Sequence, residues 1–128
     1  MCDEILPDLF RLKIPLPQSP LKYLNSYVIR AAERSMIIDT GLNRKECLEA
    51  MLTGLRKLGV DLNKSDIFIT HLHADHFGLV GKLATDSSNV FFSRPEVQAF
   101  FSSQNGIDQA FHSTFSKYGL HTGVAGNA

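Results

Sequence analysis

The sequence lacks the features that mark several broad classes of protein. It has no tryptophan and only two cysteines, Cys2 and Cys47, in 128 residues, too few for the disulfide framework of a small secreted domain. No stretch approaches the roughly 18 apolar residues of a membrane-spanning helix. The 13 basic and 13 acidic residues cancel, and a balanced charge creates no field that gathers nucleic acid or anionic lipid. We therefore expect no nucleic-acid partner and no membrane partner.

The first residues and the sparse thiols favour a cytoplasmic protein. The opening MCDEILPDLF carries acidic groups and a proline, where a secretory signal needs basic residues and an apolar run. Two cysteines so far apart are typical of reduced thiols, and Cys47 fits a small core residue beside a helical stripe. With 44% hydrophobic and 20% charged residues, the chain has the composition of a globular domain.

Hydrophobic patterning predicts strands first and then alternating helices and strands. The expected strands cover residues 9–14, 27–31, 36–40, 66–70 and 90–92. The expected helices cover 43–59, with Asn43 as cap and Gly59 as stop, then 79–84, a segment opened by Ser93, and a segment around 107–118. This order predicts an α/β fold in which one mixed sheet carries helices on one face. Its other face would need a partner.

Four residues of metal-ligand type follow the buried strand predicted at 66–70. His71, His73, Asp75 and His76 lie within six residues and include three of the five histidines. Residues two apart on an extended chain point the same way, so His71 and His73 could face one ion, and Asp75 and His76 a second. Imidazole and carboxylate suit zinc, and also iron or manganese. A solvated histidine-rich turn is the alternative, but this spacing at a strand end favours a metal site.

Two motifs resemble a known family. THLHADHFGLVG is similar to the HxHxDH signature of the metallo-β-lactamase superfamily, and MIIDTGL resembles that family's strand followed by Asp-Thr-Gly. The pattern is nearest to hydroxyacylglutathione hydrolase-like enzymes. The resemblance implies an αββα sandwich with metal ions at one edge between two sheets. It also implies a hydrolase in which a metal-bound hydroxide attacks the substrate.

The resemblance assigns roles to individual residues. His71 and His73 would ligate the first zinc ion, and Asp75 and His76 the second, with Asp75 also orienting the nucleophile as the catalytic residue. Asp39 and Gly41 would support the ligand loop from the second motif. The proline-rich segment IPLPQSPLKYLN resembles the family's overhanging loop, so residues 21–24 are candidates for substrate contact. An exposed hairpin connection explains that segment equally well.

The sequence also departs from the family pattern. The family takes a third histidine, a bridging aspartate and a final histidine from the later half of the sandwich, whereas only His112 and His121 follow His76 here. A two-sheet sandwich commonly runs to about 200–250 residues. Residues 1–128 therefore resemble a partial domain whose C-terminal half is missing. We expect weak or absent metal, negligible hydrolysis, and self-association through the uncovered sheet face.

These observations predict a metal-dependent hydrolase that acts on a small ester, thioester or lactone. The 128-residue chain itself is expected to be an incomplete, weakly active or inactive fragment of it. The alternative is a non-enzymatic truncated domain that serves as an assembly or metal-binding module. A nuclease or phosphodiesterase is less favoured because the neutral charge does not suit a nucleic-acid polymer. A coding sequence that continues beyond Ala128 with the missing ligands would favour the enzyme.

Overall fold

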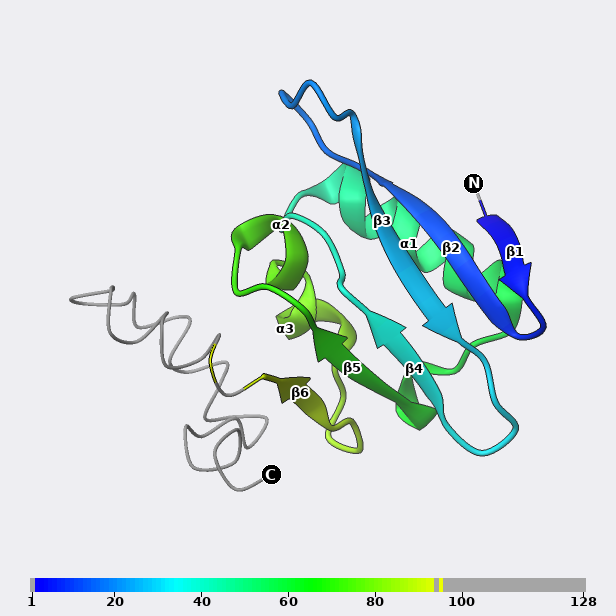
Figure 1. Cartoon of the computed structure of the whole chain (residues 1–128). Coiled ribbons are helices and arrows are strands. Elements are labelled where there is room, and N and C mark those ends of the chain that lie inside the picture. Colours follow the sequence, from blue (N-terminus) through cyan, green and yellow to red (C-terminus); the bar gives the residue numbers. More distant parts are fainter. Residues whose placement is uncertain (1, 94, 96–128) are drawn as a thin grey trace.

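The computed structural model describes residues 2–93 and residue 95 and contains one mixed sheet of six strands in the order β1-β2-β3-β4-β5-β6 (Figure 1). The strands are β1 Cys2–Leu6, β2 Leu9–Pro15, β3 Tyr23–Ile29, β4 Ser35–Ile38, β5 Ser65–Ile69 and β6 Val90–Phe92. The first four strands pair antiparallel, and β4, β5 and β6 pair parallel. Parallel pairing brings the carboxyl ends of β4 and β5 to the same edge of the sheet.

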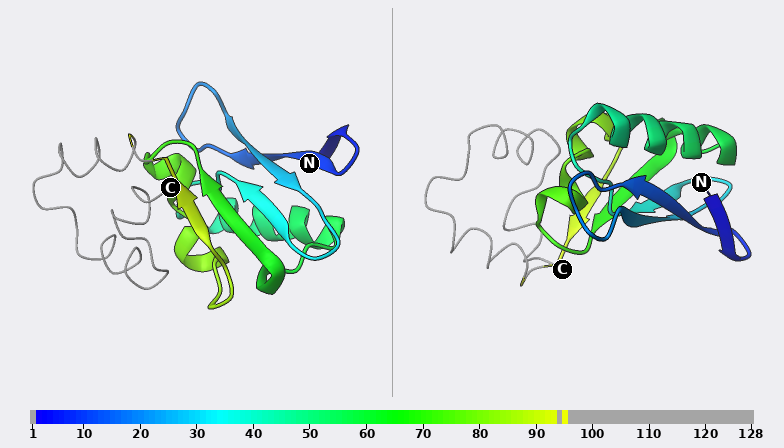
Figure 2. Two further views of the ribbon diagram at one scale, coloured as in Figure 1. Left: turned by 60° about the horizontal axis from the view of Figure 1, so that its bottom comes forward. Right: turned by 90° about the horizontal axis from the view of Figure 1, so that it is seen from above.

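Two helices cover one face of this sheet. Helix α1 (Lys45–Leu58) connects β4 to β5 through the short 3-10 helix η1 (Leu62–Lys64), and α3 (Val80–Leu83) lies between β5 and β6. Figure 2 shows α1 and α3 on the same side of the sheet. The single-turn helix α2 (Ala74–Phe77) follows the short loop that leaves β5 and lies at the carboxyl edge.

The core fills the space between the sheet and these helices. Alternate residues of β2 and β5 are buried because successive side chains of a strand point to opposite faces. The helices supply the apolar stripe that meets them. The largest fully buried side chains include Leu12, Ile14, Ile37, Met51, Leu55, Ile67, Ile69, Leu79 and Leu83. Cys47 is completely buried among them, as its sequence position predicts.

All five strands expected from the sequence are confirmed, four of them with shifted ends. The mixed sheet with helices on one face is confirmed. The strand at 90–92 is reproduced residue for residue, and the strand at 9–14 extends to Pro15. The two runs expected as a hairpin are β3 and β4, although β3 begins at Tyr23, four residues earlier than predicted. Gly59 does end α1, in the left-handed conformation with φ 69° that glycine adopts easily.

Three expectations about local structure are wrong or incomplete. The cap of α1 is Arg44, in extended conformation and without a side-chain capping bond, so the prediction of Asn43 fails. Strand β1 was not expected, because its acidic residues and exposed side chains hide the alternation. The helix predicted at 79–84 is the four-residue α3, and the single turn α2 before it was not predicted. The helices expected from Ser93 and around 107–118 lie outside the described residues.

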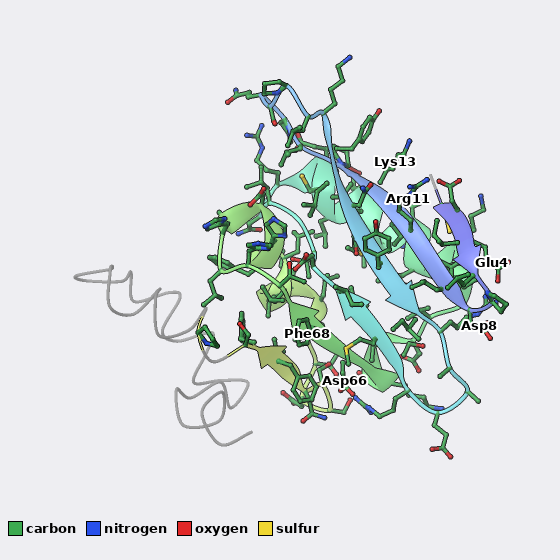
Figure 3. All side chains as sticks on the ribbon, in the orientation of Figure 1. Glu4, Asp8, Arg11, Lys13, Asp66 and Phe68 are labelled. Carbon is green, nitrogen blue, oxygen red and sulfur yellow. The ribbon has the colours of Figure 1, made fainter. Side chains whose placement is uncertain are left out.

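The opposite face of the sheet carries an apolar row. The strand register places Tyr27 beside Ile38, Ile38 beside Phe68, and Phe68 beside Phe91, so the row crosses β3, β4, β5 and β6. Phe91 is 42% exposed, and the other three side chains are partly buried. None of the described helices lies on this face. Phe68 and Arg11, labelled in Figure 3, lie on this face of the sheet, because the residues on either side of them in β5 and β2 are buried on the other face.

An ion pair ties the β3–β4 turn to the start of β5. Arg34 Nη2 donates to Asp66 Oδ1 at 2.7 Å, and the backbone N–H of Asn89 donates to the same oxygen at 2.9 Å. The hydrogen bond from the Arg34 guanidinium lowers the pKa of the Asp66 carboxyl. This network lies at the amino end of β5, away from the histidine motif. Among the described residues, no helix is both long enough and apolar enough to cross a membrane.

Candidate metal centre

The histidine motif occupies the loop that leaves the carboxyl end of β5. Because β4 and β5 are parallel neighbours, the segment after β4 runs beside this loop. The backbone N–H of Asp39 donates to Phe68 O at 2.9 Å, which continues the strand pairing past the end of β4. The two family-like motifs, separated by 31 residues between Asp39 and Thr70, therefore meet in space.

Asp39 anchors the ligand loop through its side chain. Its carboxylate accepts two hydrogen bonds from Thr70, from the backbone N–H to Oδ1 at 2.8 Å and from the hydroxyl to Oδ2 at 2.6 Å. Asp39 is only 6% exposed and has a positive φ of 63°, a conformation that aspartate tolerates better than most residues. The hydroxyl of Ser26 donates to its carbonyl oxygen at 2.7 Å. A buried carboxylate held in this way fixes the end of β5 relative to β4.

Thr40 and Gly41 continue this anchor. Both the backbone N–H and the hydroxyl of the buried Thr40 donate to His76 O at 2.7 Å, and the Leu79 N–H donates to the Thr40 hydroxyl at 3.2 Å. Gly41 has φ 136°, and a Cβ there would lie 3.0 Å from Ile14 Cγ2. The α-carbon of Gly41 thus packs on the core, and the side-chain hydrogen bonds to the histidine loop are made by Asp39 and Thr40.

The three histidines of the motif form one cluster. The ring centres of His71 and His76 are 5.1 Å apart, those of His71 and His73 are 5.9 Å apart, and those of His73 and His76 are 6.5 Å apart. His71 and His73 are exposed, whereas His76 is partly buried. The buried Leu72 between the first two holds the loop to the core. The loop therefore presents two accessible imidazoles beside a third that is partly enclosed.

Asp75 and His76 come from the turn of helix α2, which begins after His73. The N–H groups of His76 and Phe77 donate to the His73 carbonyl oxygen at 2.8 and 3.1 Å. His76 Nε2 lies 3.8 Å from Asp75 Oδ2. Its other ring nitrogen, Nδ1, lies 3.0 Å from Asp39 Oδ2 but is buried and makes no aligned hydrogen bond. That contact is electrostatic and not a hydrogen bond, because distance alone does not make a hydrogen bond.

The donor chemistry of this cluster fits zinc, but the described residues do not complete a site. Imidazole nitrogens and a carboxylate are ordinary zinc ligands, and His71 and His73 expose their rings on the same loop. In the part of the chain that the structure describes, no three His, Cys, Asp or Glu side chains are already arranged to hold an ion. His112 and His121 lie outside that part.

Three residues that shape this loop were not singled out from the sequence. Thr70 and Thr40 hold it by hydrogen bonds. Gly78 ends α2 where the chain passes closest to the segment after β4: a Cβ on it would lie 2.6 Å from Gly41 O and 2.7 Å from Asn43 N. Thr70 precedes the proposed ligand His71, and Thr40 follows Asp39 in the DTG motif. A hydroxyl beside a motif residue was therefore the available signal for these two. The close approach at Gly78 leaves none.

The fold and this loop together define the metallohydrolase type of α/β domain, and comparison with known proteins gives the family. The family model described as metallo-beta-lactamase superfamily matches residues 21–112. The chain belongs to the metallo-β-lactamase superfamily.

Individual relatives match only part of their own length. A lactamase-like protein of Pestalotiopsis microspora is 32% identical over 85 residues, which are 63% of this chain and 25% of that protein. The lactamase-like protein adaB of Aspergillus niger is 31% identical over 81 residues, 60% of this chain and 25% of its own. The chain thus spans about a quarter of the length of these curated relatives.

Solved structures share the same fold. A metallo-beta-lactamase family protein of Thermus thermophilus superposes with a TM-score of 0.62 at 26% identity, and the match covers 87% of this chain and 42% of that chain. The metallo-beta-lactamase GOB-18 of Elizabethkingia meningoseptica gives a TM-score of 0.60 at 18% identity, and the match covers 77% of this chain and 34% of the GOB-18 chain. The second likeness concerns the fold alone.

Proposed function

We propose that this chain carries the ligand loop of a metal-dependent hydrolase that acts on a small ester, thioester or lactone. The observation that supports this most is the cluster of three imidazoles and one carboxylate on a single loop. That loop is attached to the sheet by the hydrogen bonds of Asp39 and Thr40. Functional groups on a loop held by rigid strands keep their relative positions.

The four side chains divide into two pairs in this proposal. His71 and His73 hold one ion, and Asp75 and His76 hold a second, with zinc preferred and iron or manganese as alternatives. When bound, such ions polarise the substrate oxygen and lower the pKa of water. The Asp75 carboxylate, partly buried in the first turn of α2, orients the attacking water and accepts its proton.

The composition of the chain favours a small acyl substrate over a nucleic-acid polymer. The connection between β2 and β3 carries Leu21, which is 76% exposed and is one of the residues 21–24 proposed to contact substrate. The backbone N–H of Leu16 donates to Lys22 O at 2.7 Å, which closes the connection between β2 and β3 into a tight loop. The balanced charge of the chain provides no attraction for a nucleic-acid polymer.

The test is zinc titration and turnover of the 128-residue chain. We expect zinc to shift the ring signals of His71, His73 and His76 in nuclear magnetic resonance spectra and to be lost on dialysis, because the described ligands do not close a site. Thioester, activated ester and lactone hydrolysis should be slow, zinc-dependent and absent in Asp75→Asn. Histidine signals unchanged at saturating zinc would contradict the proposal. Zinc retained at stoichiometric level after dialysis would contradict the expected weakness.

The alternative function, an assembly module, is favoured by a sheet face on which no described helix lies. The row Tyr27, Ile38, Phe68 and Phe91 is apolar across four strands, and exposed apolar patches of this kind promote association. We propose that a second copy of the chain covers this face. Sedimentation at increasing concentration should show a species heavier than 14.2 kDa, and Phe68→Lys should shift it toward the monomer. A single 14.2 kDa species at all concentrations would refute the proposal.

A further inference from the structure

The hydrogen bonds around Thr70 constrain where the proton of His71 resides. Thr70 Oγ1 donates to Asp39 Oδ2 at 2.6 Å and also lies 2.9 Å from His71 Nδ1. Both contacts use the same hydroxyl oxygen. A hydroxyl has one hydrogen to donate and lone pairs to accept with, so the two contacts must differ in direction.

The carboxylate decides that direction. An ionised carboxylate only accepts hydrogen bonds, so the Thr70 hydrogen goes to Asp39. The contact with His71 is then a hydrogen bond only if His71 Nδ1 carries the hydrogen and the Thr70 oxygen accepts it. A neutral imidazole has one N–H, so its Nε2 is left with a free lone pair.

We propose that Thr70, held by Asp39, is a positioning residue that fixes the Nδ1–H tautomer of His71 and leaves Nε2 as its cation-binding atom. The opposite tautomer would set two lone pairs against each other at 2.9 Å, or would take the Thr70 hydrogen away from Asp39. Charge-assisted hydrogen bonds are the stronger class, so the network favours the Nδ1–H form by roughly tenfold or more.

The position of Asp39 makes this arrangement rigid. Its carboxylate is buried, and the Thr70 backbone N–H donates to Oδ1 at 2.8 Å, so the main chain beside His71 is held independently of the hydroxyl. A histidine ligand is oriented by the hydrogen bond of its other ring nitrogen. The use of Nε2 for a cation depends on the proposed function, whereas the tautomer itself does not.

The choice of variant follows from the same contacts. Replacing Asp39 would also disturb His76, whose Nδ1 lies 3.0 Å from Asp39 Oδ2. Thr70→Val removes only the hydroxyl, keeps the β-branched shape, and retains the backbone N–H that bonds Asp39. Thr70→Ser keeps the hydroxyl and is the matched control.

The first measurement is the ring ¹⁵N shifts of His71 in the metal-free protein, recorded above the ordinary histidine pKa of about 6.5. Wild type and Thr70→Ser should show the Nδ1–H tautomer, and Thr70→Val should show a substantial Nε2–H fraction. Wild type in the Nε2–H form, or Thr70→Val with unchanged shifts, would overturn the proposal. If Thr70→Val does not fold, the wild-type and Thr70→Ser spectra still decide the assignment.

A zinc titration then separates this proposal from the function on which its use depends. Thr70→Val should bind zinc about tenfold more weakly than wild type, and Thr70→Ser should stay within about twofold of it. If His71 shows the expected tautomer but its signals do not respond to zinc, the positioning role of Thr70 is supported and the proposed metallohydrolase function is contradicted. Weaker zinc binding in Thr70→Val with an unchanged tautomer would contradict the positioning role alone.

Discussion

Replacing Gly78 by alanine is expected to lower the free energy of unfolding by about 3 kcal/mol, the upper end of the usual cost of overpacking. A Cβ at this position would lie 2.6 Å from both Ala74 O and Gly41 O, and 2.7 Å from Asn43 N. All three are backbone atoms, so no side chain can rotate away. The end of α2 and the segment after β4 would have to separate.

That separation should also reach the histidines. Thr40, next to Gly41, holds His76 through two hydrogen bonds of 2.7 Å to the His76 carbonyl oxygen. Moving the two segments apart lengthens these bonds and tilts α2. Because loss of outer support for a ligand typically costs about 10- to 100-fold in metal affinity, zinc binding should weaken by at least about tenfold.

Gly59→Ala is the matched control for Gly78→Ala. Gly59 has φ 69° at the end of α1, and a Cβ there would meet nothing within 4 Å. Alanine at this position carries only the left-handed backbone penalty of about 1 kcal/mol and leaves the histidine loop untouched. Urea unfolding and zinc titration of both variants check the comparison. Equal stability of the two variants would show that the close approach at Gly78 is not maintained in solution.

The parts of the fold that the sequence predicts correctly depend on strong local periodicity. The continuous apolar run at residues 67–69 could only be a short buried strand, and the stripe of α1 ends at a glycine that adopts the conformation expected of it. Strand β1 escapes prediction because it lies at the edge, where three of its five residues are exposed. Its alternation is therefore weak, and its pairing with β2 depends on the tertiary fold.

The candidate site, too, is only partly predictable from the sequence. The spacing of His71, His73 and His76 is visible in the sequence, and the cluster of their rings follows from a tight turn after a strand. The free ring nitrogen that we propose for His71 depends on Asp39, 31 residues before Thr70. Such a contact depends on the parallel pairing of β4 with β5. No local pattern encodes it.

Substituting both His71 and His73 by alanine is expected to abolish zinc binding at the first of the two proposed ion sites. Loss of a single outer partner costs about 10- to 100-fold in affinity, so loss of two ligands should cost roughly 1,000-fold or more. Both side chains are exposed, and surface substitutions usually change stability by less than about 0.5 kcal/mol. The variant should therefore unfold in urea as the wild type does. Any zinc response that remains at the His76 ring should come from the Asp75–His76 pair alone.

The control for this double variant removes two other imidazoles. His112→Ala with His121→Ala leaves the loop after β5 intact and lowers the histidine count equally. In that protein the signals of His71 and His73 should still move with zinc, because the two rings with centres 5.9 Å apart are unchanged. If His71→Ala with His73→Ala instead retained wild-type zinc response and hydrolysis, these two imidazoles would not be ligands. Other side chains would then bind the zinc, and His71 and His73 would be solvated residues of a turn stabilised by Asp39 and Thr40.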